Sequence, residues 1–219
     1  MAAQADSGIS VETDTTSSVY QELHRRLIAR EVPADRPLLE TALSSELGVA
    51  RSSAREALLL LHHDGLLERV SRGFRVRRRS AEEILEIIEI RTLLESEIAA
   101  RAAMHHRPLD LARLTHLQEV AESRPYEPAL DWQWHEAIRD AAHSPNLAEL
   151  VQSLVFRLAA AESPNYSPVA DPAANTADHR RITDAVVARD ADAARKAMIA
   201  HLERVRDLRL AAFAQLPRQ

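Results

Sequence analysis

Four residues in the second half of the chain have side chains that could together hold a metal ion. Asp131 and His135 are four residues apart, so in a helix they share one face. His179 and His201 each fall on a stripe of apolar residues with helical spacing. A carboxylate and three imidazoles that turn inward need polar partners, and a divalent ion such as Zn, Ni or Mn would satisfy all four. The same residues could instead be hydrogen-bonded inside a core, as buried polar groups usually are.

Helices are the elements that must position these four residues. The first long helix predicted after Arg79 ends before Pro108, and the periodicity predicts five more, over approximately 110–123, 129–142, 145–162, 174–189 and 191–214. Prolines separate most of these segments. Six helices with short connections favour an antiparallel bundle over residues 80–219. Facing helices of a bundle often assemble a metal site between them.

A second group of polar residues lies near the N-terminus, in a helix-turn-helix pattern. A short helix around Leu43 and Leu47 is followed by Gly48, and a further helix starts near Arg51. In such a motif the first residues of the second helix meet base edges in the major groove of DNA. Arginine suits guanine and serine suits a base or a phosphate. The candidate DNA contacts are therefore Arg51, Ser52, Ser53 and Arg55. Two packed helices with a solvated arginine face remain the alternative.

A basic hairpin follows the helix-turn-helix pattern. Leu66–Val70 and Phe74–Arg77 read as short strands, and the tight turn between them holds Arg72 and Gly73. Arg72 at the tip could reach a neighbouring groove as a wing. The order of three helices and a basic hairpin predicts a winged helix-turn-helix over residues 19–79. The polar residues 1–18 before it are predicted to be a disordered tail.

Composition and charge agree with a mainly α protein that has two different modules. The net charge is −5, yet residues 19–79 hold 12 arginines against 8 acidic residues. A basic module joined to an acidic one suggests that the first contacts a polyanion. The chain has no cysteine, no secretory signal and no apolar run long enough to cross a bilayer. We therefore expect a cytoplasmic protein without a membrane partner.

The N-terminal module resembles the GntR family of bacterial regulators. The stretch "LLETALSSELGVARSSAREALLLLHHDGLLERVSRGFRV" matches the family pattern through its Leu-Gly-Val turn, its Arg-Glu-Ala-Leu run and its glycine-tipped wing. Ala50 departs from the pattern, since it lacks the hydroxyl of the usual serine. The resemblance implies that Arg51, Arg55 and the wing at Arg72 and Gly73 make most of the DNA contacts.

The helical module resembles the FCD ligand-binding domain of FadR-type GntR regulators. The run Asp131-Trp132-Gln133-Trp134-His135 with Asn146 downstream matches the aspartate–histidine signature of that domain. The resemblance implies that the metal ligands are Asp131, His135, His179 and His201, and that a small carboxylate effector completes the coordination.

Three further side chains are candidates for contacting the effector. Arg91 and Arg139 could each pair with its carboxylate. An exposed Arg139 and an Arg91–Glu95 pair four residues apart are the alternatives. Tyr166, in the proline-rich loop, could close over the cavity.

Together these observations predict a transcription regulator rather than an enzyme. We expect a homodimer that binds a near-palindromic double-stranded operator. The family resemblance implies repression that the effector relieves. Two alternatives remain: the metal could be purely structural, or the site could belong to a small metal-dependent hydrolase. The hydrolase reading has less support because no HExxH-type motif occurs and Glu136 faces away from the four residues.

Overall fold

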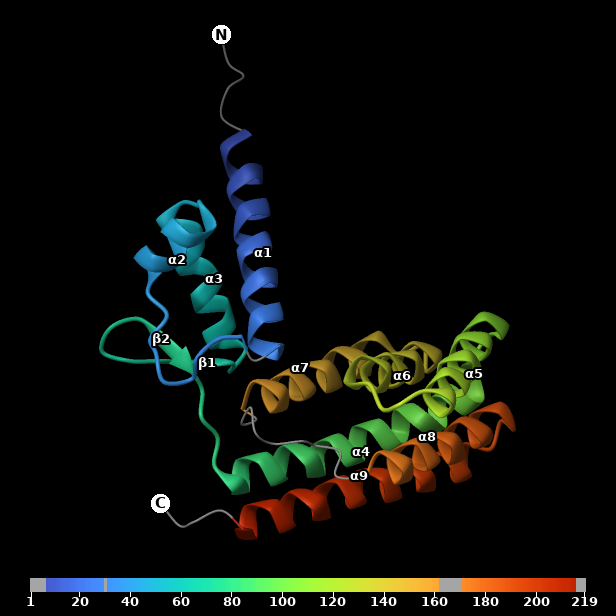
Figure 1. Ribbon diagram of the computed structural model, residues 1–219. Coiled ribbons are helices and arrows are strands. Elements are labelled where there is room, and N and C mark those ends of the chain that lie inside the picture. The colour runs from blue at the N-terminus through green and yellow to red at the C-terminus, as the bar shows by residue number, and fades with distance from the viewer. Residues whose placement is uncertain (1–6, 30, 162–170, 216–219) are drawn as a thin grey trace. The chain divides into compact units, whose positions relative to one another are not determined.

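The computed structural model describes residues 7–29, 31–161 and 171–215, which form helices and one small sheet (Figure 1). They divide into two compact units. The N-terminal unit contains the described residues up to Ser80 and a short stretch that begins at Val155. The helical unit contains the rest. The predicted mainly α class is confirmed.

The N-terminal unit is a three-helix cluster with a hairpin. Its elements are α1 (Ser7–Ile28), α2 (Glu40–Leu47), α3 (Arg51–His63), β1 (Leu67–Arg69) and β2 (Phe74–Val76). The two strands are antiparallel, with Leu67 opposite Val76. Apolar side chains spaced at helical intervals meet in one core. That core includes Val19, Leu23, Leu27, Leu43, Ala54, Ala57, Leu58, Leu61, Leu66, Leu67, Phe74 and Val76.

The beginning of α1 differs from the sequence prediction. Residues 7–18, which we expected in a disordered tail, are helical and continue without a break into the apolar stripe of α1. Thr16 is buried, and its hydroxyl lies 3.5 Å from the Glu56 carboxylate on α3. The polar composition suggested disorder, but a helix already nucleated by its buried half extends at little cost.

A glycine fixes the wing to the rest of the N-terminal unit. Gly73 has φ +87°, and a Cβ there would lie 2.3 Å from the carbonyl oxygen of Leu38. The next residue, Phe74, exchanges two backbone hydrogen bonds with Leu38, at 3.0 and 2.6 Å. Only glycine tolerates both this conformation and this close approach. The hairpin is therefore tied to the segment that leads into α2.

The last turns of α7 (Pro145–Ala161) belong to the N-terminal unit rather than to the helical unit. Phe156 packs edge-on against His24 of α1, with ring centroids 4.1 Å apart. Arg157 donates from Nε to the carbonyl oxygen of Asp64 at 2.9 Å. These contacts cover the side of the three-helix cluster formed by α1 and the end of α3.

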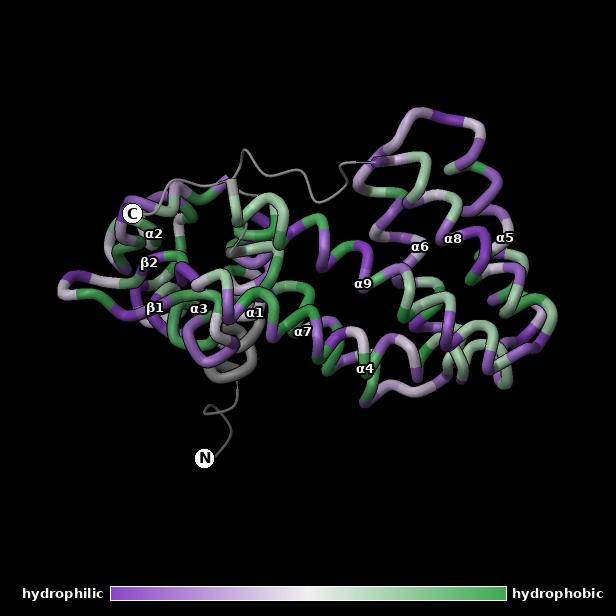
Figure 2. Tube along the Cα trace, turned by 90° about the horizontal axis from the view of Figure 1, so that it is seen from below, coloured by the Kyte–Doolittle hydropathy of each residue, from purple (hydrophilic) through white to green (hydrophobic). Residues whose placement is uncertain are grey.

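The helical unit is built on the pair α4 (Ala81–His105) and α9 (Ala191–Gln215), which pack along each other. α6 (Pro128–Ala141) and α8 (Pro172–Val187) each contact α4. α5 (Pro108–Ser123) contacts α6 and α8. Proline occupies the first turn of several of these helices, where its missing N–H has no cost. The six helices predicted after residue 80 are all present. Hydrophobic and hydrophilic residues alternate along them (Figure 2).

Within the described residues, no helix is both long enough and apolar enough to cross a membrane.

Candidate metal centre and nucleic-acid interface

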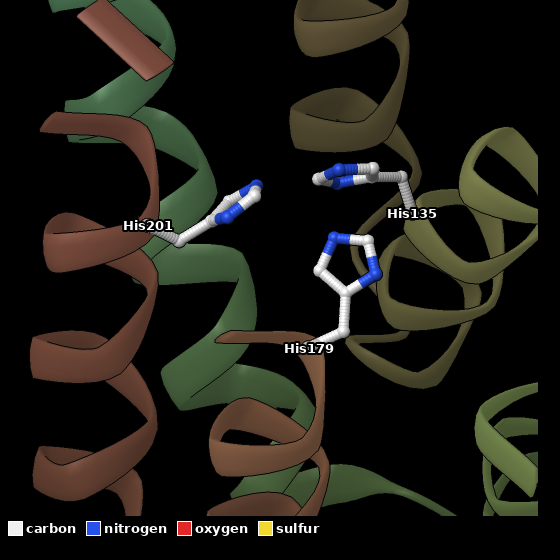
Figure 3. Close-up of side chains that lie close together, drawn as sticks. All are labelled: His135, His179 and His201. Atoms are coloured by element: carbon white, nitrogen blue, oxygen red, sulfur yellow. The ribbon is translucent and has the colours of Figure 1, made fainter. Parts of the chain in front are cut away.

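Three imidazole rings converge inside the helical unit, each from a different helix (Figure 3). His135 comes from α6, His179 from α8 and His201 from α9. One ring nitrogen of each lies within 4.8 Å of the others. Tetrahedral zinc with bonds of about 2.0–2.1 Å would need these nitrogens about 3.3 Å apart.

The chemistry of the three histidines suits a divalent ion. Nδ1 of His135 and Nε2 of His179 are buried and have no hydrogen-bond partner in the described structure. Burial lowers the pKa of His179 well below its ordinary value, and the neighbouring histidines lower it further. Burial also lowers the pKa of His201. Both rings are therefore neutral at neutral pH, the form in which imidazole binds a metal. Unpaired buried nitrogens are costly unless a ligand reaches them.

Asp131, the predicted fourth ligand, lies at the edge of this group. Its Oδ1 is 3.7 Å from Nε2 of His179 and accepts a hydrogen bond from Asn175 at 2.7 Å. It is not within 4.8 Å of all three histidine nitrogens. Asp131 and His179 also line a cavity of about 20 Å³, space for a water molecule but not for an organic acid.

Stacking with a tryptophan orients one of the imidazoles. The Trp134 ring lies parallel to that of His179, with centroids 3.7 Å apart. Trp134 itself is fully buried and donates from Nε1 to the Thr183 hydroxyl at 3.1 Å. Both rings therefore have restricted rotation, which favours a preorganised site.

The two arginines predicted as effector contacts are both buried, but they differ in their partners. Arg91 donates to Glu95 at 2.6 Å, which is the pair that the sequence left open as an alternative. Arg139 is only 5% exposed, so its exposed alternative is wrong. It lies over the Trp132 ring and has no hydrogen bond or ion pair within the described residues. Burial lowers the pKa of Arg139, and Glu95 partly offsets this effect.

Glu95 is a buried residue of this site that the sequence prediction did not include. Its other carboxylate oxygen lies 3.4 Å from Nδ1 of His135. Burial alone would raise the pKa of Glu95. The neighbouring Arg91 and His135 have the larger, opposite effect, so the pKa is lowered and the carboxyl is ionised. Of the two buried guanidiniums, only that of Arg91 is hydrogen-bonded to Glu95.

Asn175, Asp178 and Arg204 were also missed. The first two stand four and one residues before His179, on a helix whose buried stripe was already recognised. Polar residues on that stripe were the available signal. Tyr166, proposed to close over the cavity, lies outside the described residues.

At the surface of the N-terminal unit, Arg51 and Arg55 of α3 point into solvent, with side chains 68% and 63% exposed. Both approach the carboxylate of Glu40, at 3.6 and 3.8 Å. Their guanidiniums are thus held near each other and remain accessible to a polyanion. Ala50, the residue before α3, provides no side-chain cap, and free amides at a helix N-terminus favour phosphate.

Ser53 does not belong to this surface. Its side chain is buried, at 1% exposure, and its hydroxyl has no hydrogen-bond partner in the described structure. Residue 53 stands four positions before Ala57 and so lies on the inward stripe of α3. The prediction that Ser53 contacts DNA is wrong, while the neighbouring Ser52 is exposed.

The wing presents one accessible cation at its tip. Arg72 is exposed and makes no hydrogen bond or ion pair within the described part of the chain. Gly73, which we had grouped with the DNA contacts, has the backbone role described above. The nearby Arg75 is engaged by Glu68 at 3.0 Å.

Comparison with known proteins agrees with this arrangement. Residues 15–76 match the model of the bacterial regulatory proteins of the gntR family, and residues 86–204 match the FCD domain. A winged helix-turn-helix joined to such a helical domain defines a transcriptional regulator. The chain belongs to the GntR family, in its FadR-type branch with an FCD domain.

Two of the similar curated proteins, both from Escherichia coli (strain K12), regulate operons by their names. One, with a provisional assignment as the L-lactate dehydrogenase operon regulatory protein, is 32% identical over 189 residues, covering 74% of this chain and 73% of the relative. The Uxu operon transcriptional regulator is 30% identical, with 84% and 81% of the two chains covered. Among solved structures, E. coli McbR/YncC superposes with a TM-score of 0.76 at 22% identity, covering 91% of this chain and 98% of its own. The last likeness shows the fold.

Proposed function

We propose that this regulator is a repressor whose affinity for its operator is controlled by a small organic acid bound at a metal site in the helical unit. The observation that carries the proposal is the group of three imidazoles in which Nδ1 of His135 and Nε2 of His179 make no hydrogen bond, although a carboxylate lies within 4 Å of each. A hydrogen-bonded core would not leave such nitrogens without partners. A divalent ion, with Zn, Ni or Mn as the candidates, would bind His135, His179 and His201, with Asp131 as the fourth ligand.

The effector is proposed to be a carboxylate because of the charge beside the metal ligands. Glu95 forms an ion pair with Arg91, whereas Arg139 lies over the Trp132 ring and makes no hydrogen bond or ion pair among the described residues. A carboxylate that binds there would form an ion pair with Arg139. This pair would compensate the guanidinium for the hydration that it loses on burial. The bound metal would supply a second, Lewis-acidic contact for the same ligand. The cavity next to Asp131 is too small for an acid, so binding requires side chains to move.

Recognition of DNA is assigned to the exposed surface of the N-terminal unit. Arg51, Ser52 and Arg55 would enter the major groove, and Arg72 would reach the neighbouring groove. Two copies in a homodimer would read the two halves of a near-palindromic operator. Large apolar side chains that are exposed on the helical unit support such a dimer, notably Leu93 at 72% and Leu150 at 55%.

The recognition surface is tested by fluorescence anisotropy with DNA from the promoter that the protein controls. Arg51→Ala should weaken operator binding at least tenfold, because one bidentate contact to guanine is worth about 1–3 kcal/mol. Arg25→Ala is the matched control, since it removes the same charge from α1, where Glu22 and Glu31 engage Arg25. Equal effects of the two substitutions would contradict the assignment of α3.

The sensor is tested in the same assay, with metal-loaded protein and a panel of small carboxylic acids. L-lactate is the first acid to test, because of the operon named for the first Escherichia coli relative. An acid that releases DNA from the wild type should fail with Arg139→Met but act normally on Arg113→Met, an exposed arginine that pairs with Glu136 and Asp140. If metal is bound but no acid in the panel changes DNA affinity, the alternative of a purely structural metal is favoured.

The metal itself is tested by elemental analysis of purified protein. His135→Ala should remove bound metal, whereas replacement of exposed His116 should not. Equal metal content in wild type and His135→Ala would refute the site.

A further inference from the structure

A network of polar side chains surrounds the histidine group on the side of α8 and α9. Asp178 is buried, and its carboxylate accepts hydrogen bonds from Nε of Arg204 at 2.6 Å and from Arg181. The same carboxylate lies 3.4 Å from Nδ1 of His201. Each of its oxygens therefore has a donor, and the group is fixed in place.

This contact determines which nitrogen of His201 carries the proton. Asp178 accepts from a guanidinium on each of its oxygens, from Arg204 on one and from Arg181 on the other. A carboxylate that two guanidiniums hold in this way accepts hydrogen bonds, so Nδ1 of His201 donates to it. The lone pair is then on Nε2, the nitrogen left to bind a metal.

A second branch leads to Asp131. The side-chain oxygen of Asn175 accepts from the guanidinium of Arg204 at 3.3 Å, and its nitrogen donates to Oδ1 of Asp131 at 2.7 Å. The Arg204 contact requires the amide oxygen of Asn175 to face the guanidinium, and this leaves the amide nitrogen to face the carboxylate. One amide thus transmits the position of Arg204 to a residue on α6.

We infer that Arg204 is a positioning residue that orients two proposed metal ligands at once, His201 through Asp178 and Asp131 through Asn175. The inference rests on the proposed metal site. The single guanidinium of Arg204 contacts both branches, so α6 and α9 present these two ligands in a fixed relation. Partners that hold metal ligands in this way typically contribute 10- to 100-fold in metal affinity.

The test measures the dissociation constant for Zn²⁺ of the full-length protein by competition with a chromophoric chelator. Arg204→Met keeps the apolar stem and removes both branches, and should raise the dissociation constant about 10- to 100-fold. Arg204→Lys can supply only one of the two contacts and should give an intermediate value. Arg206→Met is the matched control, because Arg206 lies two residues away and pairs with Asp207. It should bind Zn²⁺ as the wild type does.

A double-mutant comparison distinguishes positioning through two branches from a general loss of packing. Asn175→Ala interrupts only the branch to Asp131. In that background, Arg204→Met should cost less than it does in the wild type, because one of its two effects has already been removed. An unchanged cost in the two backgrounds would overturn the two-branch arrangement.

A second measurement needs no metal. Nitrogen chemical shifts of His201 in the metal-free protein report its tautomer, which should be the Nδ1–H form in the wild type and in Arg206→Met. Arg204→Met should populate the other tautomer. Wild-type protein that binds no Zn²⁺ would refute the proposed function, whereas equal Zn²⁺ affinity and an unchanged tautomer in Arg204→Met would refute only the positioning role.

Discussion

The buried histidines should make the metal-free helical unit sensitive to mild acid. His179 and His201 have lowered pKa values in the folded protein, while the unfolded chain has the ordinary value of about 6.5. Below that pH the unfolded chain binds protons that the folded form does not. Stability is therefore fully present above pH 6.5 and is lost as the pH falls toward the folded values.

The size of the loss follows from the two groups. Between pH 7 and pH 5.5, each histidine that stays unprotonated in the folded form contributes about 1.3 kcal/mol, so the upper limit is about 2.5 kcal/mol. The lowered pKa values of Glu95 and Asp178 do not interfere, because those carboxyls titrate at lower pH.

The assay is urea unfolding of chelator-treated protein followed by tryptophan fluorescence. Both tryptophans of the chain, Trp132 and Trp134, lie in α6, so the signal reports the helical unit alone. His179→Gln should reduce the loss by about half, and exposed His116→Gln should leave it unchanged. Equal unfolding free energies of the wild type at the two pH values would refute the reasoning.

Three other predictions concern the N-terminal unit. Gly73→Ala should destabilise the wing by about 1–3 kcal/mol, because φ is +87° and the new Cβ would meet the Leu38 carbonyl. Faster amide hydrogen exchange at Phe74 would show this destabilisation, and unchanged exchange would contradict it. Ser53→Ala should change operator affinity by no more than about twofold. The free energy of unfolding should stay equal or rise by up to about 1 kcal/mol, because the substitution removes a buried hydroxyl without a hydrogen-bond partner. A tenfold loss of affinity would show that Ser53 contacts DNA after all. Arg72→Ala should reduce the slope of log K against log salt by about 1, measured by anisotropy, and an unchanged slope would exclude a phosphate contact at the wing tip.

Periodicity was sufficient to predict the elements of the fold. The helices after Arg79 and the hairpin around Gly73 appear where apolar spacing and turn residues placed them. These signals are local, because each helix or turn is specified by its own residues. The helical start of α1 was not predicted, because its polar residues show no apolar stripe, and the contact of the buried Thr16 with Glu56 joins residues 40 positions apart.

The candidate site was predictable in part for the same reason. His135, His179 and His201 were found from their places on apolar stripes. The polar residues around these histidines were not predicted. The contact between Arg204 and Asn175, for example, joins residues 29 positions apart, and the spacing of residues in the sequence gives no signal for such a pair. Ser53 was predicted to contact DNA because serine is a residue type that binds phosphate or a base. Its position on the inward stripe of α3, which buries it, indicates the opposite.

The backbone bonds between Leu38 and Phe74 have a consequence for the proposed DNA complex. They brace the wing against the segment that begins α2, and we expect this bracing to hold the wing tip and the start of α3 as one rigid template. A rigid template cannot adapt to a groove of the wrong width, and the duplex must deform instead. The energy of that deformation depends on base steps that no side chain touches. Operators with identical contacted bases should therefore differ in affinity according to the stiffness of the DNA between them.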